Sequence, residues 1–448
     1  MNVLEKALQM LEAHALCDHC LGRQFALLGY NIENSDRGNA IKLGLTLQAS
    51  ALVQSNDLSG LKNLKLLAAN GFSREAAETL RHLKKRVPKN AQQCFLCEGR
   101  FQLLDSLFRK ALNEIECYEY ATFLVGVELP FAVEECEDEF KAAFNVSYGE
   151  SIRHEFGRLL GKSVEAQTGK TVEYRKPGIV ILVNPFTESI KLQVNPLFVA
   201  GRYRKLVRGI PQSKWFCSNC RGEGCEKCGS TGLLYPESVE ALVSKPLLEA
   251  AEGEKTSFHA SGREDIDARM LGSGRPFVVE VSKPRKRFLD LRKLKEVINV
   301  AAADKVEVSS LRFSNKDVVR RLKKAESAQK EYRVLVEFES DVPEDDLRLV
   351  AEKLSNAAIK QQTPLRVLHR RADLTRERYI YVVKVKKVSP NRAEMQIRCQ
   401  GGLYVKELVS GDEGRTVPSI SELLGNRAKP IKLDVLNVIM DEVGEMKK

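Results

Sequence analysis

Alternating charges in one short stretch give this chain its clearest candidates for acid–base or nucleophilic chemistry. Between Gly262 and Pro276 three acids alternate with three arginines, and glycines stand at positions 262, 272 and 274. The apolar residues of an amphipathic helix recur every three to four positions, and because they do not do so here we expect a tight loop. Cations on both sides of a carboxylate keep it ionised at neutral pH. A solvated charged turn would carry the same residues, so the charge pattern alone leaves both interpretations open.

Four cysteines close together form a second candidate site, suited to a metal ion. They fall within twelve residues, and the glycines between them permit the tight turns that bring four sulfur ligands around one Zn²⁺. Two disulfides in so short a segment would be strained. Because the protein fills all four coordination positions, we expect a structural site rather than a catalytic one. The ligands of this predicted zinc site are Cys217, Cys220, Cys225 and Cys228.

Two further Cys-x-x-Cys pairs lie nearer the N-terminus and are separated by more than seventy residues. Helices expected over 40–55, 60–70 and 73–86 would have to bring the pairs together. A redox-active pair is the alternative, but no thioredoxin-like strand–helix–strand pattern surrounds either pair. We therefore expect a second structural zinc, since cysteines in a chain of cytosolic character more often bind metals than form disulfides. Its ligands would be Cys17, Cys20, Cys94 and Cys97.

Three separated motifs resemble those of one enzyme family. Residues 262–265 (Gly-Arg-Glu-Asp) resemble the Arg-x-Asp signature of pseudouridine synthases, residues 330–332 (Lys-Glu-Tyr) resemble their second motif, and residues 401–408 resemble their third. The continuation through Phe277 resembles one branch, the archaeal-type synthases that act on the tRNA T loop and carry a THUMP-containing N-terminal half. Residues 362–371 fit the same branch, so the resemblance covers essentially the whole chain.

The resemblance implies a role for each motif residue. Asp265 is the expected catalytic residue, acting as a nucleophile on the sugar carbon or as a base for its 2′ proton. Tyr332 is expected to stack on the target base, and Lys406 to hold Asp265 ionised and oriented. The remaining expected substrate contacts are Leu403 and Tyr404 as walls of the base pocket, Arg263, and the cations of residues 362–371 on the RNA backbone.

Asp267 competes with Asp265 for the catalytic role. The two aspartates stand two residues apart, so in an extended segment both would point to the same face. The family signature places its aspartate two residues after Arg263, and this selects Asp265. Asp267 would then be a structural partner of Arg269 or Arg275 that fixes the loop.

The reaction that the resemblance implies is a cofactor-free isomerisation of T-loop uridines, at positions 54 and 55 of tRNA. A net charge of +11 and a pI near 9.0 favour such a polyanionic partner. Cations clustered in residues 201–209 form either a phosphate-contacting patch or a solvated strand edge, and we favour the former. The candidate phosphate contacts in this patch are Arg202, Arg204 and Lys205.

Two other classes of function compete with this interpretation. A zinc-bearing RNA-binding module without catalysis would explain the charge and both cysteine sets, but not the three dispersed motifs. Another THUMP enzyme, a methyltransferase or a thiolase, would need a site for a nucleotide-derived cofactor. Neither a strand-linked Gly-x-Gly-x-x-Gly nor a nucleotide-binding Ser-Gly-Gly run is present, so we expect no nucleotide cofactor. No obligate protein partner is implied either.

The helices and strands expected around these residues indicate an α+β protein of several domains. Strands are expected at 178–183 and 189–194 in the N-terminal half. In the catalytic half, helices at 290–302 and 343–357 stand among more numerous strands, one of them at 364–371, and this order favours a mixed sheet. The resemblance to pseudouridine synthases implies that this sheet is mostly antiparallel. No apolar run approaches the roughly 20 residues of a membrane span, no signal peptide is evident, and we expect a cytoplasmic protein. The expected domains are a helical zinc-binding segment (1–100), a THUMP-like RNA-binding domain (101–215), a zinc-binding four-cysteine loop with linker (216–250) and a pseudouridine synthase catalytic domain (251–448).

Overall fold

The computed structural model describes residues 2–89, 91, 93–324 and 328–439. The chain divides into two compact units between residues 195 and 196. The boundaries expected at 215 and 250 therefore fall inside the second unit. The reason is the strand β5 (Leu197–Lys205), which pairs with two strands of the second unit and thus belongs to its sheet.

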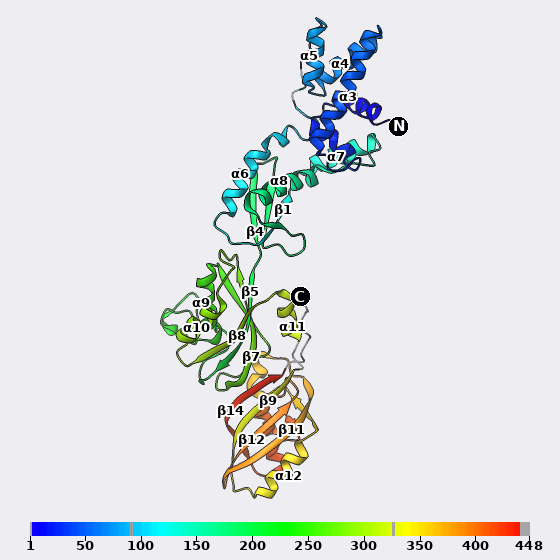
Figure 1. Ribbon diagram of the computed structural model, residues 1–448. Coiled ribbons are helices and arrows are strands. Elements are labelled where there is room, and N and C mark those ends of the chain that lie inside the picture. Colours follow the sequence, from blue (N-terminus) through cyan, green and yellow to red (C-terminus); the bar gives the residue numbers. More distant parts are fainter. Residues whose placement is uncertain (1, 90, 92, 325–327, 440–448) are drawn as a thin grey trace. The chain divides into compact units, whose positions relative to one another are not determined.

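Helices form the N-terminal part of the first unit (Figure 1). They are α1 (Val3–Ala13), α2 (Asp18–Gly22), η1 (Arg23–Phe25), α3 (Asn34–Gln54), α4 (Leu58–Ala69) and α5 (Arg74–His82). Side chains at the N-caps of α1, α4 and α5 accept hydrogen bonds from backbone N–H groups of the first turn, and these residues are Asn2, Asp57 and Ser73. The predicted stretch of successive helices before residue 86 is confirmed.

A four-stranded sheet with order β2-β1-β3-β4 completes the described part of the first unit. Its strands are β1 (Thr122–Val127), β2 (Thr171–Val172), β3 (Ile179–Asn184) and β4 (Ser189–Val194), and its helices are η2 (Arg100–Leu103), α6 (Leu104–Ile115), α7 (Phe131–Ala143) and α8 (Ile152–Thr168). Every second residue of β3 is fully buried, which explains why alternation predicted this strand. Helix α7, in contrast, was not expected from the sequence.

One mixed sheet organises the second unit, and its described strands number ten. They are β5, β6 (Lys255–Ala260), β7 (Arg269–Ser282), β8 (Val306–Phe313), β9 (Gln329–Phe338), β10 (Ala357–Gln362), β11 (Thr375–Ser389), β12 (Arg392–Cys399), β13 (Thr416–Val417) and β14 (Ala428–Ile439). Nine follow the order β13-β10-β11-β12-β9-β14-β7-β5-β8, and β6 pairs with β7. Among these pairs only β14 and β7 are parallel, so the predicted mostly antiparallel sheet is confirmed.

Helices cover this sheet and complete two hydrophobic cores (Figure 1). The helices are α9 (Val239–Ala251), α10 (Leu291–Ala301), α11 (Lys316–Lys324), α12 (Glu344–Leu354), α13 (Val405–Ser410) and α14 (Ile420–Leu424), with short η3 (Glu226–Cys228), η5 (Leu365–Arg370) and η6 (Asp412–Gly414). One core gathers buried residues of β9 to β12 with α12 and α13. The other gathers residues of β5, β7 and β8 with α9 and α10. Each half of the sheet thus packs against its own helices and has its own hydrophobic core.

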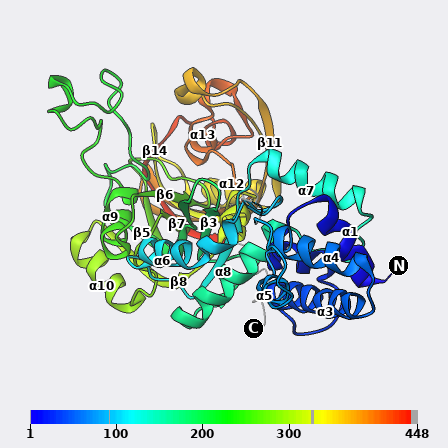
Figure 2. The ribbon, with the colours of Figure 1, turned by 90° about the horizontal axis from the view of Figure 1, so that it is seen from above.

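Two connections leave the sheet and carry candidate site residues. Residues 261–268 link β6 to β7, so the expected tight loop is real but shorter than the charge pattern indicated. The long connection from β5 to α9 contains the four cysteines between residues 217 and 228, and we call residues 217–228 the four-cysteine loop. Figure 2 shows this connection, in green, reaching away from the sheet.

The prediction of a strand at 364–371 is wrong. The preceding segment 357–362 forms β10, and Pro364 caps the 3₁₀ helix η5. The expected helix 343–357 ends at Leu354, because Asn356 adopts a left-handed backbone conformation (φ 57°) that turns the chain into β10. Hydrophobic alternation could not reveal β10, since one of its two buried residues is the polar Gln361.

Among the described helices, none is both long enough and apolar enough to cross a bilayer.

Candidate active site

A cavity of about 840 Å³ lies over the middle of the second unit's sheet. Its walls come from the β6–β7 loop, strands β9 and β14, helix η5 and the segment 401–406. All three sequence motifs thus reach one cavity although they are far apart in the chain. The wall is strongly basic, since the described lining residues include six arginines and two lysines against three acids.

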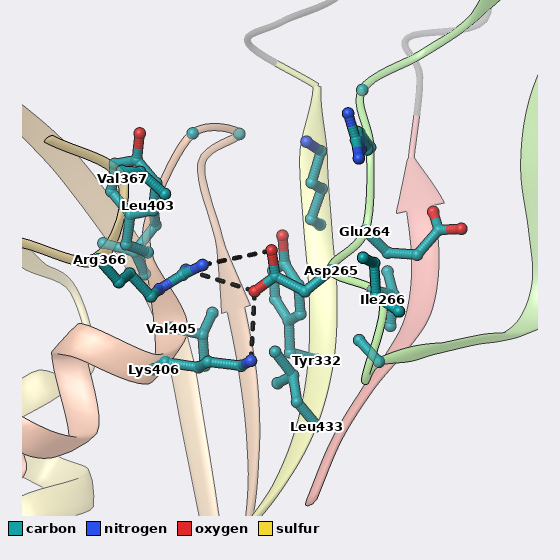
Figure 3. A pocket seen from close by; sticks show the side chains of 18 of the residues that line it. Glu264, Asp265, Ile266, Tyr332, Arg366, Val367, Leu403, Val405, Lys406 and Leu433 are labelled. Carbon is teal, nitrogen blue, oxygen red and sulfur yellow. Dashed lines mark hydrogen bonds and ion pairs between the residues drawn. The ribbon is translucent and has the colours of Figure 1, made fainter. Parts of the chain in front are cut away.

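Asp265 lies in this cavity between two cations (Figure 3). Its carboxylate is 3.3 Å from Nη2 of Arg366 and 3.4 Å from Nζ of Lys406. About a third of the Asp265 side chain is exposed, so solvent and substrate can reach it. The predicted pairing of Lys406 with Asp265 is confirmed. The second cation, Arg366, was expected only as one of the RNA backbone contacts.

Arg366 is held in place by a buried acid. Its Nε donates to Oε1 of Glu407 at 2.6 Å, and the Glu407 side chain is almost completely buried. Burial would lower the pKa of Arg366, but the adjacent Glu407 and Asp265 carboxylates raise it above its usual range. Because Glu407 lies on α13 and Arg366 on η5, this pair fixes one wall of the cavity against the other.

Asp267 pairs with Lys406 rather than with the partners expected from the sequence. The Lys406 Nζ donates to both Asp267 carboxylate oxygens at 2.8 and 2.7 Å. Burial would raise the pKa of Asp267, but the hydrogen bond from Lys406 lowers it below its usual value. The expected partner Arg269 instead contacts Asp434 at 2.8 Å, and Arg275 contacts Glu264 at 2.9 Å, so that prediction is wrong.

Behind the loop, a buried pair anchors the residue before Asp265. Glu264 accepts hydrogen bonds from Nε of Arg275 at 2.9 Å and from the Tyr203 hydroxyl at 2.9 Å, and all three side chains are buried. Arg275 also donates to the carbonyl of Ser261 at 2.7 Å. This network fixes the first half of the β6–β7 loop, and no motif in the sequence indicated it.

Lys205 is a second buried support, and its prediction as a phosphate contact is wrong. Its side chain is fully buried, and its Nζ donates to the backbone carbonyls of Asp265 and Ile266 at 3.1 and 3.2 Å. A third bond, at 2.9 Å, goes to the carbonyl of Ile210. Burial lowers the pKa of Lys205 to about 8. The ammonium therefore holds the β6–β7 loop in place and cannot reach an RNA phosphate.

The other two predicted phosphate contacts on β5 lie outside the cavity lining. Arg202 donates to backbone carbonyls of Ser273, at 2.7 Å, and Gly274, at 2.9 Å. Arg204 forms an ion pair with Glu307. Their contact with RNA stays a prediction.

Tyr332 lies on the central strand β9, at the cavity end of an alternating row that continues into the fully buried Val334 and Val336. Its neighbours across the sheet are Ile397 on β12 and Val435 on β14. Burial raises the pKa of the Tyr332 hydroxyl well above its usual value, so it stays protonated at neutral pH. In Figure 3 the Tyr332 ring lies next to the Asp265 carboxylate. The predicted gathering of these two side chains is confirmed.

The third motif supplies the opposite wall. Leu403 is buried and, with Val405, gives this wall of the cavity apolar groups, whereas Leu433 of β14 lies beside Tyr332 (Figure 3). Tyr404 is fixed at both ends, since its N–H donates to Gln361 and its hydroxyl accepts a hydrogen bond from Arg371 at 2.9 Å. Leu403 and Tyr404 thus both line the cavity, and their role as walls of a base pocket stays a prediction.

Two groups of four cysteines are gathered closely enough to bind one metal ion each. In each group the four Sγ atoms lie within 4.8 Å of one another, and all eight thiols are free of disulfides. Backbone N–H groups of Gly224 and Gly232 donate to the sulfurs of Cys220 and Cys228 at 3.2 Å, a contact that favours thiolates. Four thiolates form a donor set that suits Zn²⁺. The predicted clustering of both cysteine sets is confirmed.

Two family descriptions match the sequence. Residues 198–439, more than half of the chain, match "Pus10, C-terminal". Residues 107–184 match "Pus10 THUMP domain, archaeal", within the unit where a THUMP-like domain was expected.

Curated relatives named "tRNA pseudouridine synthase Pus10" are similar along nearly their whole length. The protein of Methanothrix thermoacetophila is 40% identical over 98% of this chain and 94% of its own. That of Methanocaldococcus jannaschii is 44% identical over 96% and 93%, and that of Pyrococcus furiosus 38% identical over 99% and 100%. Among solved structures, a Cbf5–Nop10–Gar1 complex overlaps 53% of this chain and 48% of the matched chain, with 17% identity and a TM-score of 0.31, which is too small a likeness to support an argument.

Proposed function

Because the chain belongs to the Pus10 family of tRNA pseudouridine synthases, we propose that it converts the T-loop uridines at positions 54 and 55 of tRNA to pseudouridine, with Asp265 as its catalytic residue. One observation carries the proposal. The Asp265 carboxylate lies between Arg366 and Lys406 in the same cavity as Tyr332. A carboxylate can supply the nucleophile or base, and an aromatic ring can stack on the base, in the isomerisation of a flipped-out uridine.

The reaction itself balances without a cofactor. The bond between N1 of uracil and C1′ of ribose breaks, the ring turns, and a bond forms from C5 to C1′. The proton on C5 is lost and N1 ends protonated, so nothing is oxidised, reduced or added. The cavity therefore has to supply an acid–base or nucleophilic group and a wall that retains the detached uracil.

Asp265 can serve this reaction in two ways. As a nucleophile it attacks C1′ while the bond to N1 breaks, and it leaves when C5 attacks C1′. As a base it removes the 2′ proton and returns it after the ring has turned. In both cases the ion pairs with Arg366 and Lys406 hold the carboxylate in position before the substrate arrives.

The basic wall of the cavity suits an RNA substrate. Arginine and lysine side chains neutralise backbone phosphates and fix the register of a nucleic acid without reading its sequence. Four further arginines line the cavity and are expected to contact the phosphates that flank a flipped uridine. Arg370 ends η5, Arg371 follows it, and Arg376 and Arg378 lie on β11.

The two cysteine groups would hold zinc and stabilise their local folds. Cys17, Cys20, Cys94 and Cys97 would bind one ion, and the cysteines of the four-cysteine loop another. Four thiolates leave no open coordination position, so such a metal supplies structural stability rather than a group for the reaction.

An assay without additives tests the proposed function directly. Purified protein is incubated with unmodified tRNA alone, and pseudouridine is then mapped by base-specific chemical labelling. We expect conversion at positions 54 and 55. Binding without conversion would favour the non-catalytic RNA-binding module, and conversion elsewhere in the tRNA would overturn the assignment to the T loop.

Tyr332 should separate stacking from chemistry. We expect Tyr332→Phe to keep tRNA affinity but to lower turnover, whereas Tyr332→Ala also loosens the base pocket. Stacking of a base on an aromatic ring contributes roughly 1–3 kcal/mol, so the alanine variant should lose about ten- to a hundredfold in that contribution. Steady-state kinetics and filter binding measure the two effects.

Tyr379→Ala is the matched control, because Tyr379 is an exposed tyrosine on β11. Unchanged kinetics in both Tyr332 variants would show that Tyr332 only packs in the core and does not contact the substrate.

Elemental analysis should find two zinc ions per chain. Cys225→Ser should remove one of them and unfold the four-cysteine loop, because metal binding and folding are coupled in such short sites. Cys117→Ser is the control, since Cys117 is exposed and belongs to neither group. A wild-type content of one equivalent or none would contradict the assignment.

A further inference from the structure

Trp215 lies at the junction between the four-cysteine loop and the cavity. It is the only tryptophan in the sequence, stands two residues before Cys217, and lines the cavity beside the β6–β7 loop. Its backbone carbonyl accepts a hydrogen bond from the N–H of Leu234 at 2.8 Å, and its ring packs edge-on against Tyr235 at 5.6 Å. The indole is thereby fixed where the chain enters and leaves the four-cysteine loop.

Two arginines contact this indole. The guanidinium carbon of Arg263 lies 4.8 Å from the centre of the Trp215 ring system, and that of Arg370 lies 5.9 Å from it. Within the described part of the chain, neither arginine has a carboxylate within ion-pair distance, whereas Arg366 has two. Burial and then the nearby Arg370 lower the pKa of Arg263, and the Glu264 and Asp265 carboxylates offset only part of this effect.

The two arginines belong to the two segments that also carry the catalytic ion pair. Arg263 precedes Asp265 by two residues in the β6–β7 loop, and Arg370 follows Arg366 by four in η5. Asp265 and Arg366 join these segments directly, and Trp215 joins them a second time through cation–π contacts. We call Trp215 with Arg263 and Arg370 the Trp215 bridge.

We propose that Trp215 is a positioning residue of this enzyme, and that the Trp215 bridge binds a backbone phosphate of the RNA next to the target uridine. The inference rests on the proposed function for the identity of the substrate. Two guanidinium groups held on one indole, both lining the cavity and both without an acidic partner among the described residues, form a site for a single anion. In an RNA substrate the anion beside a flipped base is its flanking phosphodiester. The four-cysteine loop would then contribute to the reaction indirectly, by holding the Trp215 indole in position.

Kinetics and salt dependence separate this role from simple packing. We expect Trp215→Ala to raise KM about tenfold with a smaller change in kcat, and Trp215→Phe to restore most of the affinity because it keeps an aromatic face. The slope of log affinity against log salt should fall by about 0.7–0.9, the value expected when one phosphate is no longer neutralised. The double variant Arg263→Ala with Arg370→Ala should lower the slope by the same amount, and adding Trp215→Ala to it should cause no further change.

Phe216→Ala is the matched control, because Phe216 is the exposed neighbour at the same end of the four-cysteine loop and does not line the cavity.

Tryptophan fluorescence gives a second measurement that needs no substitution. Since the chain has one tryptophan, its emission reports on this position alone. Addition of unmodified tRNA should shift the emission and reduce quenching by acrylamide, and Arg370→Ala should weaken both responses. This measurement stays decisive if Trp215→Ala fails to fold.

Two results would overturn the proposal. One is tRNA binding that leaves the emission and its quenching unchanged. The other is a salt slope that is unaltered in Trp215→Ala and in the double arginine variant alike. Binding and fluorescence report contact rather than conversion. A wild-type protein that binds tRNA without isomerising it would therefore contradict the proposed function while leaving the bridge testable.

Discussion

Asp265→Asn should abolish the conversion of T-loop uridine while leaving tRNA binding nearly unchanged. The amide is almost the same size as the carboxylate but can neither attack C1′ nor take a proton. Removal of a sole catalytic group commonly lowers turnover by roughly 10⁴-fold or more. Binding should survive because phosphate contacts are spread over the cavity wall, where six arginines lie. Single-turnover conversion and affinity at fixed salt are the two measurements.

Asp267→Asn is the matched control for this prediction. Asp267 is more exposed than Asp265, at 68% against 34% of the side chain, and touches the site through Lys406. Its loss should leave a measurable rate, since Lys406 keeps Asp265 as a partner. If Asp265→Asn still isomerises uridine and Asp267→Asn is inactive, the catalytic role belongs to Asp267.

Arg275→Met should destabilise the second unit more than any surface substitution. The Glu264 and Arg275 side chains are at most 1% exposed, so methionine leaves a buried carboxylate with the Tyr203 hydroxyl as its remaining side-chain donor among the described residues. Breaking a buried pair from one side typically costs about 3–5 kcal/mol. The β6–β7 loop should also shift, and misplacement of a catalytic group by about 1 Å can cost roughly 10²-fold in rate. Urea denaturation and the tRNA assay measure the two consequences.

The control for the buried pair is an exposed one. Arg348 and Glu344 are 2.9 Å apart on α12 with more than 60% of each side chain exposed, so Arg348→Met should cost less than about 1 kcal/mol. Combining Glu264→Leu with Arg275→Met should recover stability relative to Arg275→Met alone, because it removes both buried charges. Equal denaturation midpoints for Arg275→Met and Arg348→Met would contradict the anchoring role of the pair.

The sequence could predict the gathering of Asp265, Tyr332 and Lys406 because each lies in a short motif whose residue types are required together. Their supports carry no such local signal. Lys205 looked like one more cation in a basic run, yet the fold buries it completely beneath the Asp265 carbonyl. Its neighbour Arg204 remains partly exposed and forms an ion pair with Glu307.

The sequence also could not reveal that Arg366, on the η5 side of the cavity, pairs with Asp265. Its segment contains several arginines in seven residues, and nothing in their order tells which one faces Asp265. That depends on η5 following β10 and on Glu407 lying on α13, two placements set by long-range pairing. The expected strand at 364–371 would have placed these side chains on alternate faces of the sheet, so the error in secondary structure hid the second cation. Fold class and motif residues, Lys406 among them, were therefore predictable, whereas the supporting roles of Arg366 and Lys205 were not.

The position of β14 has a consequence for how the enzyme folds. This strand comes last among the described strands, yet it lies in the interior of the sheet, antiparallel to β9 and parallel to β7. Until it is made, β13-β10-β11-β12-β9 and β7-β5-β8 are two separate half-sheets, each with an open edge. Such edges invite non-native pairing, and contacts between strands distant in sequence form slowly. Leu433 and Val435 of β14 also line the cavity, so a nascent chain has no active site until its final strand joins the two halves.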